Sequence, residues 1–416
     1  MKILFVSMVP FEDNTSATIQ NKGIIRGLVA LGHDVDTMTL EPDRDAISFD
    51  DSMNDIKSLV NHTYYIGVDR RYALLRAKKK GSKTGPEKND ASKLSTILFN
   101  KIRAITKSIH DNTSIFDAQK INVKGISEVQ VDYPEYDMII TSSDPKSSHL
   151  LGLEIFKRNR ECRAKWIQYW GDPMLNDITR PRDWRDYIVK CYEKRLISSA
   201  DRVIYASPLT LNVQRRTFPK LAHKMDYANQ VYASVQSNGR DSVNRGNTSQ
   251  ISVAYSGAYR STVRNILPLY NAARMKGFRL SICGPSDLQL QSTDNITVRG
   301  KLPYKEATRV ESESDVIACL CNRRGTQIPG KIYYCAAYEK PIVVILDGEY
   351  KEELREFLGS FDRFLLCEND ENSIIEAIEQ ARDQLRVGEY ELPDQLKPEC
   401  MARRIIGEFA FVGSEI

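Results

Sequence analysis

The chain has 416 residues, of which 41% are hydrophobic and 27% charged, and its formal net charge is +4. This composition is typical of a soluble protein with enough apolar mass for two or three domains. A dedicated nucleic-acid-binding protein carries a larger and more clustered basic excess. We therefore expect no nucleic-acid partner.

The sequence indicates neither a secretory signal nor a membrane span. The first apolar run, residues 3–9, lacks a small-residue cleavage site and stops at Pro10. Nowhere does an apolar stretch reach the roughly 18 residues that a membrane-spanning helix needs. We expect a cytoplasmic protein, either free or peripheral on the inner face of the plasma membrane.

The cysteines are predicted to be reduced thiols within apolar segments. No Cys-x-x-Cys pair occurs among them, so their spacing does not indicate a zinc site. They are Cys162, Cys191, Cys283, Cys319, Cys321, Cys335, Cys367 and Cys400.

The first 40 residues predict a β-α-β unit. Residues 3–8 are continuously apolar, as in a parallel strand that is covered on both faces. Apolar residues then fall at helical spacing from Ile24 to Leu31, and Gly32 stands where a helix C-cap belongs. A second strand over residues 33–40 completes the opening of a doubly wound sheet.

A basic insertion is expected over about residues 61–130. Lys and Arg far outnumber Asp and Glu between Arg70 and Lys124. One interpretation is a solvated surface insertion. The other is a surface that meets anionic phospholipid, to which each basic residue would contribute about 1 kcal/mol.

Alternating strand and helix patterns define two halves of the chain. The polar segment 233–250 is predicted to be a linker, because it contains almost nothing apolar. It separates an N-terminal domain, 1–232, from a C-terminal domain, 251–397, and a last helix, 398–416, is expected to cross back to the first domain. We predict an α/β protein with two doubly wound Rossmann-like domains that face each other across a cleft.

The C-terminal half holds the residues best suited to a diphosphate. A strand ends at Gly257, the following loop carries Arg260, and Arg264 is expected in the first turn of a helix over about 261–276. A glycine allows close approach of a ligand, and a helix start with a guanidinium favours an anion. An ordinary loop with solvated arginines is the alternative for this stretch taken alone.

A second loop follows a buried strand in the same half. Pro329 and Gly330 precede a short helix that opens with Lys331, which adds positive charge where the helix dipole is already positive. By itself this pattern is also that of an ordinary loop, helix and strand.

Together these segments resemble the donor half of the family 4 glycosyltransferases, which have the GT-B fold and retain anomeric configuration. The run from Pro329 to Pro341, PGKIYYCAAYEKP, is similar to that family's Pro-Ser/Gly-Lys helix. Gly257 with Arg264 is similar to its glycine followed seven residues later by Lys or Arg, and the run LSICGPSD, which contains Gly284, resembles its next strand and loop.

The N-terminal half supports the same resemblance. Ser143 and His149 lie in a run, TSSDPKSSH, that is similar to a subset of the family. In that subset the next strand ends in Asp-Pro, which matches Asp172 here. Because buried or capping histidines are common, a structural role for His149 is the alternative.

Two departures from the family pattern stand out. Gln327 and Tyr334 occupy the positions of two glutamates, the second of which usually binds the donor ribose. The glycines of the family's first loop are replaced by small residues that include Ser16 and Ala17. An altered donor or an impaired site would both account for the first departure.

The resemblance implies transfer of a sugar from a nucleotide-sugar donor to a hydroxyl acceptor, with retention and with neither metal nor other cofactor. Lipid-linked or cell-surface glycan precursors are the expected acceptors, and an anionic membrane surface is an expected partner. The implied catalytic residues are Asp172, His149, Arg264 and Lys331. The implied donor-binding residues are Gly257, Arg260, Gly284, Gln327, Pro329, Gly330 and Tyr334, and the implied acceptor-side residues are Ser16, Ala17 and Ser143.

Other functions fit the sequence less well. A nicotinamide-dependent dehydrogenase needs Gly-x-Gly-x-x-Gly after a strand, and neither half has it. A GT-B epimerase or phosphorylase remains an alternative within the enzymes. A non-catalytic GT-B relative that binds nucleotide or glycan as an assembly partner is the alternative from another class.

Overall fold

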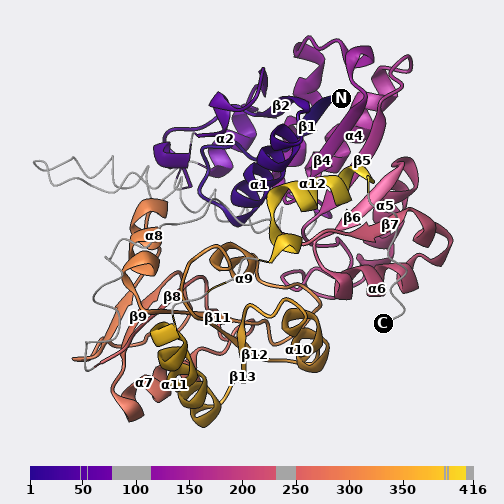
Figure 1. The fold of residues 1–416 in the computed structure, drawn as a ribbon. Coiled ribbons are helices and arrows are strands. Elements are labelled where there is room, and N and C mark those ends of the chain that lie inside the picture. Colours follow the sequence, from indigo (N-terminus) through magenta and orange to yellow (C-terminus); the bar gives the residue numbers. More distant parts are fainter. Residues whose placement is uncertain are drawn as a thin grey trace, which may run out of the picture. The chain divides into compact units, whose positions relative to one another are not determined.

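The computed structural model describes residues 1–46, 48–53, 55–76, 114–230, 250–387, 390 and 393–408, and contains two parallel sheets (Figure 1). The seven-stranded sheet has the order β3-β2-β1-β4-β5-β6-β7. Its strands are β1 (Lys2–Val6), β2 (Asp34–Leu40), β3 (Thr63–Ile66), β4 (Met138–Ser142), β5 (Lys165–Trp170), β6 (Arg202–Tyr205) and β7 (Met225–Tyr227). The helices along this part of the chain are α1 (Ser16–Ala30), α2 (Arg70–Arg76), α4 (Ser147–Arg158), α5 (Asp186–Ser199) and α6 (Pro208–Thr217).

The six-stranded sheet has the order β10-β9-β8-β11-β12-β13. Its strands are β8 (Ser252–Ser256), β9 (Arg279–Cys283), β10 (Ile296–Arg299), β11 (Val316–Leu320), β12 (Ile342–Leu346) and β13 (Leu365–Glu368). The helices are α7 (Leu267–Lys276), α8 (Tyr304–Glu313), α9 (Gly330–Cys335), α10 (Lys351–Gly359), α11 (Glu371–Val387) and α12 (Pro398–Ile406). The two doubly wound parallel sheets predicted from the sequence are confirmed.

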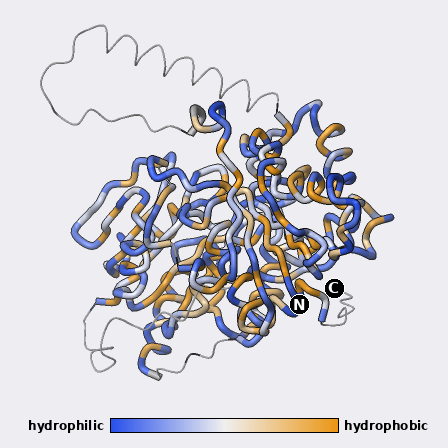
Figure 2. Tube along the Cα trace, turned by 90° about the horizontal axis from the view of Figure 1, so that it is seen from above, coloured by the Kyte–Doolittle hydropathy of each residue, from blue (hydrophilic) through white to orange (hydrophobic). Residues whose placement is uncertain are grey.

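The central strands β11 and β12 of the six-stranded sheet are buried on both faces. Along β11 and β12, Ala318 and Val343 belong to the core that also contains residues of α7 and α11, whereas Cys319 and Val344 belong to the core that contains residues of α9 and α10. Successive side chains of a strand point to opposite faces, which explains the continuous apolar runs in the sequence. Helices α7 and α11 lie side by side (Figure 1), and Figure 2 shows that hydrophobic and hydrophilic stretches alternate along the chain.

By contact density the chain divides into two compact units. The first unit comprises Met1–Thr18, Asp34–Gln168 and Arg182–Asp201, and the second comprises Ile19–His33, Tyr169–Pro181 and Arg202–Ile416. Most of the predicted linker and the central part of the predicted basic insertion lie outside the described residues, so the predicted domain boundaries stay predictions.

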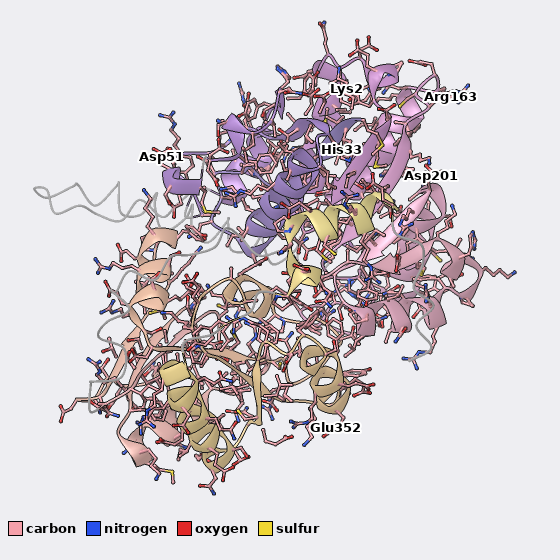
Figure 3. All side chains as sticks on the ribbon, in the orientation of Figure 1. Lys2, His33, Asp51, Arg163, Asp201 and Glu352 are labelled. Atoms are coloured by element: carbon pink, nitrogen blue, oxygen red, sulfur yellow. The ribbon has the colours of Figure 1, made fainter. Side chains whose placement is uncertain are left out.

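Each sheet has one point at which the strand order reverses. It lies between β1 and β4 in the seven-stranded sheet and between β8 and β11 in the six-stranded sheet. In the first unit, the backbone N–H of Met8, after β1, donates to Ser148 Oγ, after β4, at 3.0 Å. Elsewhere in that unit, Asp201, labelled in Figure 3, accepts from the Trp166 N–H at 2.8 Å. Ligands of open α/β sheets bind at such reversal points, outside the carboxyl ends of the strands.

Two helices differ from their predicted bounds. Helix α7 begins at Leu267, six residues later than expected, and Pro268 occupies its first turn, where a proline is best tolerated. Helix α9 is short and ends at Cys335 rather than near Tyr338. Among the described residues, no helix is both long and apolar enough to cross a bilayer.

Helices α1 and α12 pack closely at Gly27. A methyl group added at Gly27 would lie 2.1 Å from the carbonyl oxygen of Pro398. We expect Gly27→Ala to lower the free energy of unfolding by about 2 kcal/mol, because overpacking against backbone outweighs the gain in helix propensity of about 1 kcal/mol. Urea unfolding measures this change.

Gly300→Ala is the matched control, because no heavy atom lies within 4 Å of its added methyl group. A Gly27→Ala variant that is as stable as this control, or more stable than the parent, would contradict the close packing of α1 on α12.

Candidate functional site

Two glycines predicted to bind a ligand pack against each other in the second unit. Gly257 follows β8 and Gly284 follows β9, and a methyl group on Gly284 would lie 2.0 Å from the Gly257 carbonyl oxygen. The φ of Gly284, +148°, also favours glycine. In contrast, a methyl group on Gly257 would meet only the end of the Tyr255 side chain, 3.6 Å from its hydroxyl oxygen. Gly284 is therefore required by packing, whereas the space beside Gly257 is open enough for a side chain or a ligand.

Arg264 joins the two loops that flank the strand reversal between β8 and β11. Its Nε–H donates to Asn322 Oδ1 at 2.9 Å, and its Nη1 donates to the Ala258 carbonyl oxygen at 3.0 Å. Asn322 follows β11, and its Nδ2 donates to the Gln327 carbonyl oxygen at 2.8 Å. Arg264 lies three residues before α7 begins. The predicted position in a helix first turn is thus wrong, and the guanidinium is placed by the two loops instead.

Further guanidinium groups lie on the same loops. Arg260 is exposed, and its carbonyl oxygen accepts the backbone N–H of Arg264 at 2.8 Å. Arg323 was not predicted, although its place directly after a buried strand was visible in the sequence. Its Nη1 donates to the Ser261 carbonyl oxygen at 3.3 Å, and its Nε lies 4.0 Å from the Asp347 carboxylate. This end of the sheet therefore presents positive charge at a place suited to an anion.

Lys331 forms an ion pair with a carboxylate that sequence reasoning missed. Its Nζ lies 2.5 Å from Glu311 Oε1 at the end of α8, and the Glu311 side chain is only 4% exposed against 33% for Lys331. The Tyr338 hydroxyl donates to the other Glu311 oxygen at 2.8 Å. Burial lowers the pKa of Lys331, but the Glu311 carboxylate more than offsets this, so the pKa stands above its usual value. The ammonium is therefore charged but already paired.

The two residues in place of the family's glutamates hold loops of the second unit together. Gln327 Nε2 donates to the Asn176 carbonyl oxygen at 3.0 Å. The Tyr334 hydroxyl donates to Gln230 Oε1 at 3.0 Å, and burial raises the pKa of that hydroxyl. A methyl group on Gly330 would lie 2.0 Å from the same Gln230 oxygen, and Pro329 is the N-cap residue of α9.

Asp172 lies in the loop that follows β5, and this loop contacts the one between β11 and α9. The hydrogen bond from Gln327 to the Asn176 carbonyl oxygen joins these two loops. Arg324 Nη2 also donates to the Ile178 carbonyl oxygen at 3.3 Å. The same loop is anchored at Thr326, whose carbonyl oxygen accepts from Ser207 Oγ at 3.0 Å. The structure therefore brings the segment of Asp172 together with the predicted donor-binding segment, within the second unit.

The remaining predicted residues lie in the first unit, around its strand reversal. Ser16 is exposed at the start of α1, Ala17 is partly buried, and Ser143 and His149 are fully buried after β4. His149 Nδ1 lies 2.8 Å from Thr141 Oγ1, which also accepts from the indole of Trp166 at 3.0 Å. Burial, together with the charge of Lys146, holds the pKa of His149 well below its usual value. The imidazole is thus neutral.

No group of three or more His, Cys, Asp or Glu side chains in the described ranges is arranged to hold a metal ion. The cysteines are all free, and six of them are buried, with Cys191 exposed and Cys400 partly so. The prediction of unpaired thiols therefore holds, although Cys191 is not a core residue.

No protein-family model and no curated protein matches the chain. Solved structures do match. One is an alpha-glucosyltransferase in complex with UDP and a 13-mer DNA, with 11% identity, a TM-score of 0.53, and coverage of 95% of this chain and 94% of that one. Another is a variant of S. aureus TarM in complex with Fondaparinux, alpha-GlcNAc-glycerol and UDP, with 10% identity, a TM-score of 0.53, and coverage of 98% and 97%.

A third match is the N-terminal domain of Candida albicans trehalose-6-phosphate phosphatase, with 9% identity, a TM-score of 0.50, and coverage of 98% and 93%. The fold is GT-B. Identities this low show the fold alone, so membership of family 4 stays a prediction. One neighbour is bound to DNA, a partner that we do not expect for this chain, and that expectation also stays untested.

The ion pair of Lys331 makes a stability prediction. Lys331→Ala is expected to lower the free energy of unfolding by about 2–4 kcal/mol, because it leaves the buried Glu311 carboxylate without its cation; the partial exposure of Lys331 keeps the loss below the largest values known for buried pairs. Urea unfolding at neutral pH measures this loss. The double variant Lys331→Met/Glu311→Gln should recover most of it. Equal stability of the single variant and the parent would show that the pair is not formed.

The buried imidazole of His149 makes a pH prediction. Since the unfolded residue titrates near pH 6.5, its stabilising contribution is complete above that pH and is lost as the pH falls below it. Between pH 6.5 and 5.5 the parent should lose about 1 kcal/mol more stability than His149→Asn, measured by urea unfolding. Replacement of the exposed His62 by Asn is the control and should leave the slope unchanged. Parallel curves for His149→Asn and the parent would refute the neutral buried state.

Proposed function

We propose that this protein is a glycosyltransferase that moves a sugar from a nucleotide-sugar donor to a hydroxyl acceptor. The observation that carries the proposal is the position of Arg264. It is hydrogen-bonded to Asn322 across the strand reversal of the six-stranded sheet, where the loops also present Gly257 and Arg260. Ligand binding at the carboxyl ends of the strands, next to a reversal, is the general rule for such sheets.

The proposed chemistry breaks the bond between the anomeric carbon and the donor phosphate. Negative charge develops on the departing diphosphate, and guanidinium groups placed beforehand stabilise it without reorganising. Arg264 has five N–H donors, and its bonds to Asn322 and Ala258 use two of them, so it can also bind a phosphate oxygen. Lys331 is assigned a supporting role, because Glu311 already balances most of its charge.

The acceptor hydroxyl then forms the new bond to the anomeric carbon, and its proton passes to a phosphate oxygen of the leaving group. We infer retention of configuration from the resemblance to family 4. Asp172 is proposed to orient the acceptor hydroxyl. His149 has no exposed surface, so we assign it a positioning role at the start of α4 rather than contact with the acceptor.

The donor is proposed to be a UDP-sugar, because two of the structural neighbours are complexes with UDP. Tyr334 occupies the place of the ribose-binding glutamate, and its hydroxyl is held by Gln230. A divalent metal is not required in this proposal, since the arginines supply the positive charge. Activity that survives EDTA would agree with this, and activity restored only by a metal would contradict it.

A lipid-linked or cell-surface glycan precursor is the proposed acceptor, with the protein in the cytoplasm or at the inner face of the plasma membrane. The motivating feature is the basic segment between Arg70 and Lys124. A non-catalytic GT-B relative is the second candidate, and it is favoured by the engagement of Tyr334 and Lys331 in internal contacts.

Arg264→Ala tests the proposed chemistry. We expect turnover of the donor to fall by about 10²–10³-fold, because an electrostatic donor to the leaving group is lost. The assay measures free nucleotide released with and without acceptor, after a thermal-shift screen against UDP, GDP, CMP and ADP has identified the base. Arg279→Ala, at the start of β9 and thus at the opposite end of the same sheet, is the matched control and should retain full turnover.

Equal rates for Arg264→Ala and Arg279→Ala in folded protein would refute the role of Arg264. Nucleotide binding by the parent with neither hydrolysis nor transfer would favour the non-catalytic relative instead.

A further inference from the structure

Helix α5 in the first unit, together with the turn before it that carries Trp184, presents a cluster of exposed aromatic and apolar side chains. Trp184 and Tyr187 are 76% and 77% exposed, and Ile188 and Tyr192 are 37% and 40% exposed. Among the described residues, the other exposed large hydrophobics are Met1, Leu59, Leu267 and Met275, which lie elsewhere in the chain. Single exposed hydrophobics are common, but a cluster on one short segment marks an interaction site.

The cluster is not needed to hold α5 in the fold. The opposite side of the helix buries Val189, Leu196 and Ile197, and α5 packs against α4 (Figure 1). The Gln168 side chain also donates to the Leu196 carbonyl oxygen at 2.9 Å. The Tyr192 ring also packs edge-on against Phe116, with 5.8 Å between the ring centres. Because these contacts already anchor the helix, the largely exposed side chains of Trp184 and Tyr187 are available to something outside the unit.

The same exposed side of α5 is positively charged. Lys190, Lys194 and Arg195 are exposed, and their side chains form no ion pair with any described residue. The acidic residues of this helix do not neutralise these three cations. The Asp186 carboxylate lies 3.7 Å from the Arg182 guanidinium, and Glu193 is fully buried.

We propose that this α5 face docks on a membrane surface that contains anionic phospholipid. The α5 face consists of Trp184, Tyr187, Ile188, Lys190, Tyr192, Lys194 and Arg195. Aromatic side chains favour the headgroup region, and Lys and Arg on the same helix add attraction to anionic lipid.

Other partners fit the α5 face less well. The buried centre of a protein interface is depleted of lysine, whereas lysines lie beside the aromatic residues here. A neutral glycan would use the aromatic rings but not the cations. This inference does not depend on the proposed sugar transfer, and it can be tested without donor or acceptor.

Trp184 provides a direct probe of the α5 face. The chain has three tryptophans, and Trp166 and Trp170 are 2% and 0% exposed, so a change in exposure of the indole reports on Trp184. We expect vesicles of phosphatidylcholine with phosphatidylglycerol to shift the emission of the full chain to shorter wavelength. Brominated lipid in these vesicles should quench that emission. Pure phosphatidylcholine vesicles should cause a much smaller change.

Charge-reversal variants test the cations. Lys190→Glu/Lys194→Glu should weaken binding to the anionic vesicles by at least about 10-fold, measured by co-sedimentation, because each basic residue near such a surface contributes to the affinity. The matched control is Arg274→Glu/Lys276→Glu on α7 in the second unit, which changes the net charge of the protein by the same amount.

Serine substitutions test the aromatic residues. Trp184→Ser/Tyr187→Ser should also weaken binding by about 10-fold or more, whereas Met275→Ser, a control with 64% exposure on α7, should not. Because the substituted residues are exposed, the variants should unfold at the same urea concentration as the parent.

Three results would overturn the proposal. Unchanged Trp184 emission with anionic vesicles would show that the α5 face stays in water, even if another basic segment binds them. An emission shift that depends on protein concentration alone would assign the face to a second copy of the chain. A shift produced by a soluble neutral polysaccharide but not by vesicles would assign it to a glycan.

Discussion

The hydrogen bond between Arg264 and Asn322 crosses the point at which the six-stranded sheet reverses its strand order. Parallel strands bring their carboxyl ends to one edge, but they do not determine how the loops at that edge meet. The bond joins the loop after β8 to the loop after β11, and Asn322 extends the connection to Gln327. The arginine is therefore held in place before any ligand arrives, so that a bound anion would not have to order it. Such preorganisation is the main physical requirement for stabilising charge that develops during a reaction.

The buried carboxylate of Glu311 changes how charge is distributed around this edge. It pairs with Lys331 and accepts from Tyr338, so the ammonium contributes little net charge to an incoming anion. The positive charge on offer to an anion comes instead from guanidinium groups on the loops, of which Arg264 and Arg260 are examples. A buried carboxylate that lost its cation would be costly, which makes Lys331 first a structural residue. The similarity of its motif to that of a known family describes where Lys331 lies, but not how its charge is used.

The fold could be predicted from the sequence because buried strands and helices have characteristic patterns of apolar residues. Continuous apolar runs such as residues 3–8 mark strands covered on both faces, and the β-α-β order follows from their alternation with helices. The glycines at 257 and 284 were identified as loop residues, but not their contact, which depends on the register of β8 and β9. Glu311 was missed because its partner lies on another helix, and no local pattern records such a pair. The full burial of His149 likewise depends on how α4 packs against its sheet.

The departure at Gln327 has a local physical reason in this structure, whereas the one at Tyr334 does not follow from its contact. The Gln327 side chain donates to the Asn176 carbonyl oxygen, and the Tyr334 hydroxyl donates to the Gln230 side-chain oxygen. A glutamate carboxylate can only accept, so at position 327 it would face the Asn176 carbonyl oxygen without a proton between them. At position 334 the Gln230 amide could turn its NH2 group toward a carboxylate. The packing of these loops therefore requires a donor at position 327, and the missing carboxylate there is a consequence of that packing. A donor sugar nucleotide would have to find its ribose partner elsewhere, or displace Gln230 from the Tyr334 hydroxyl when it binds.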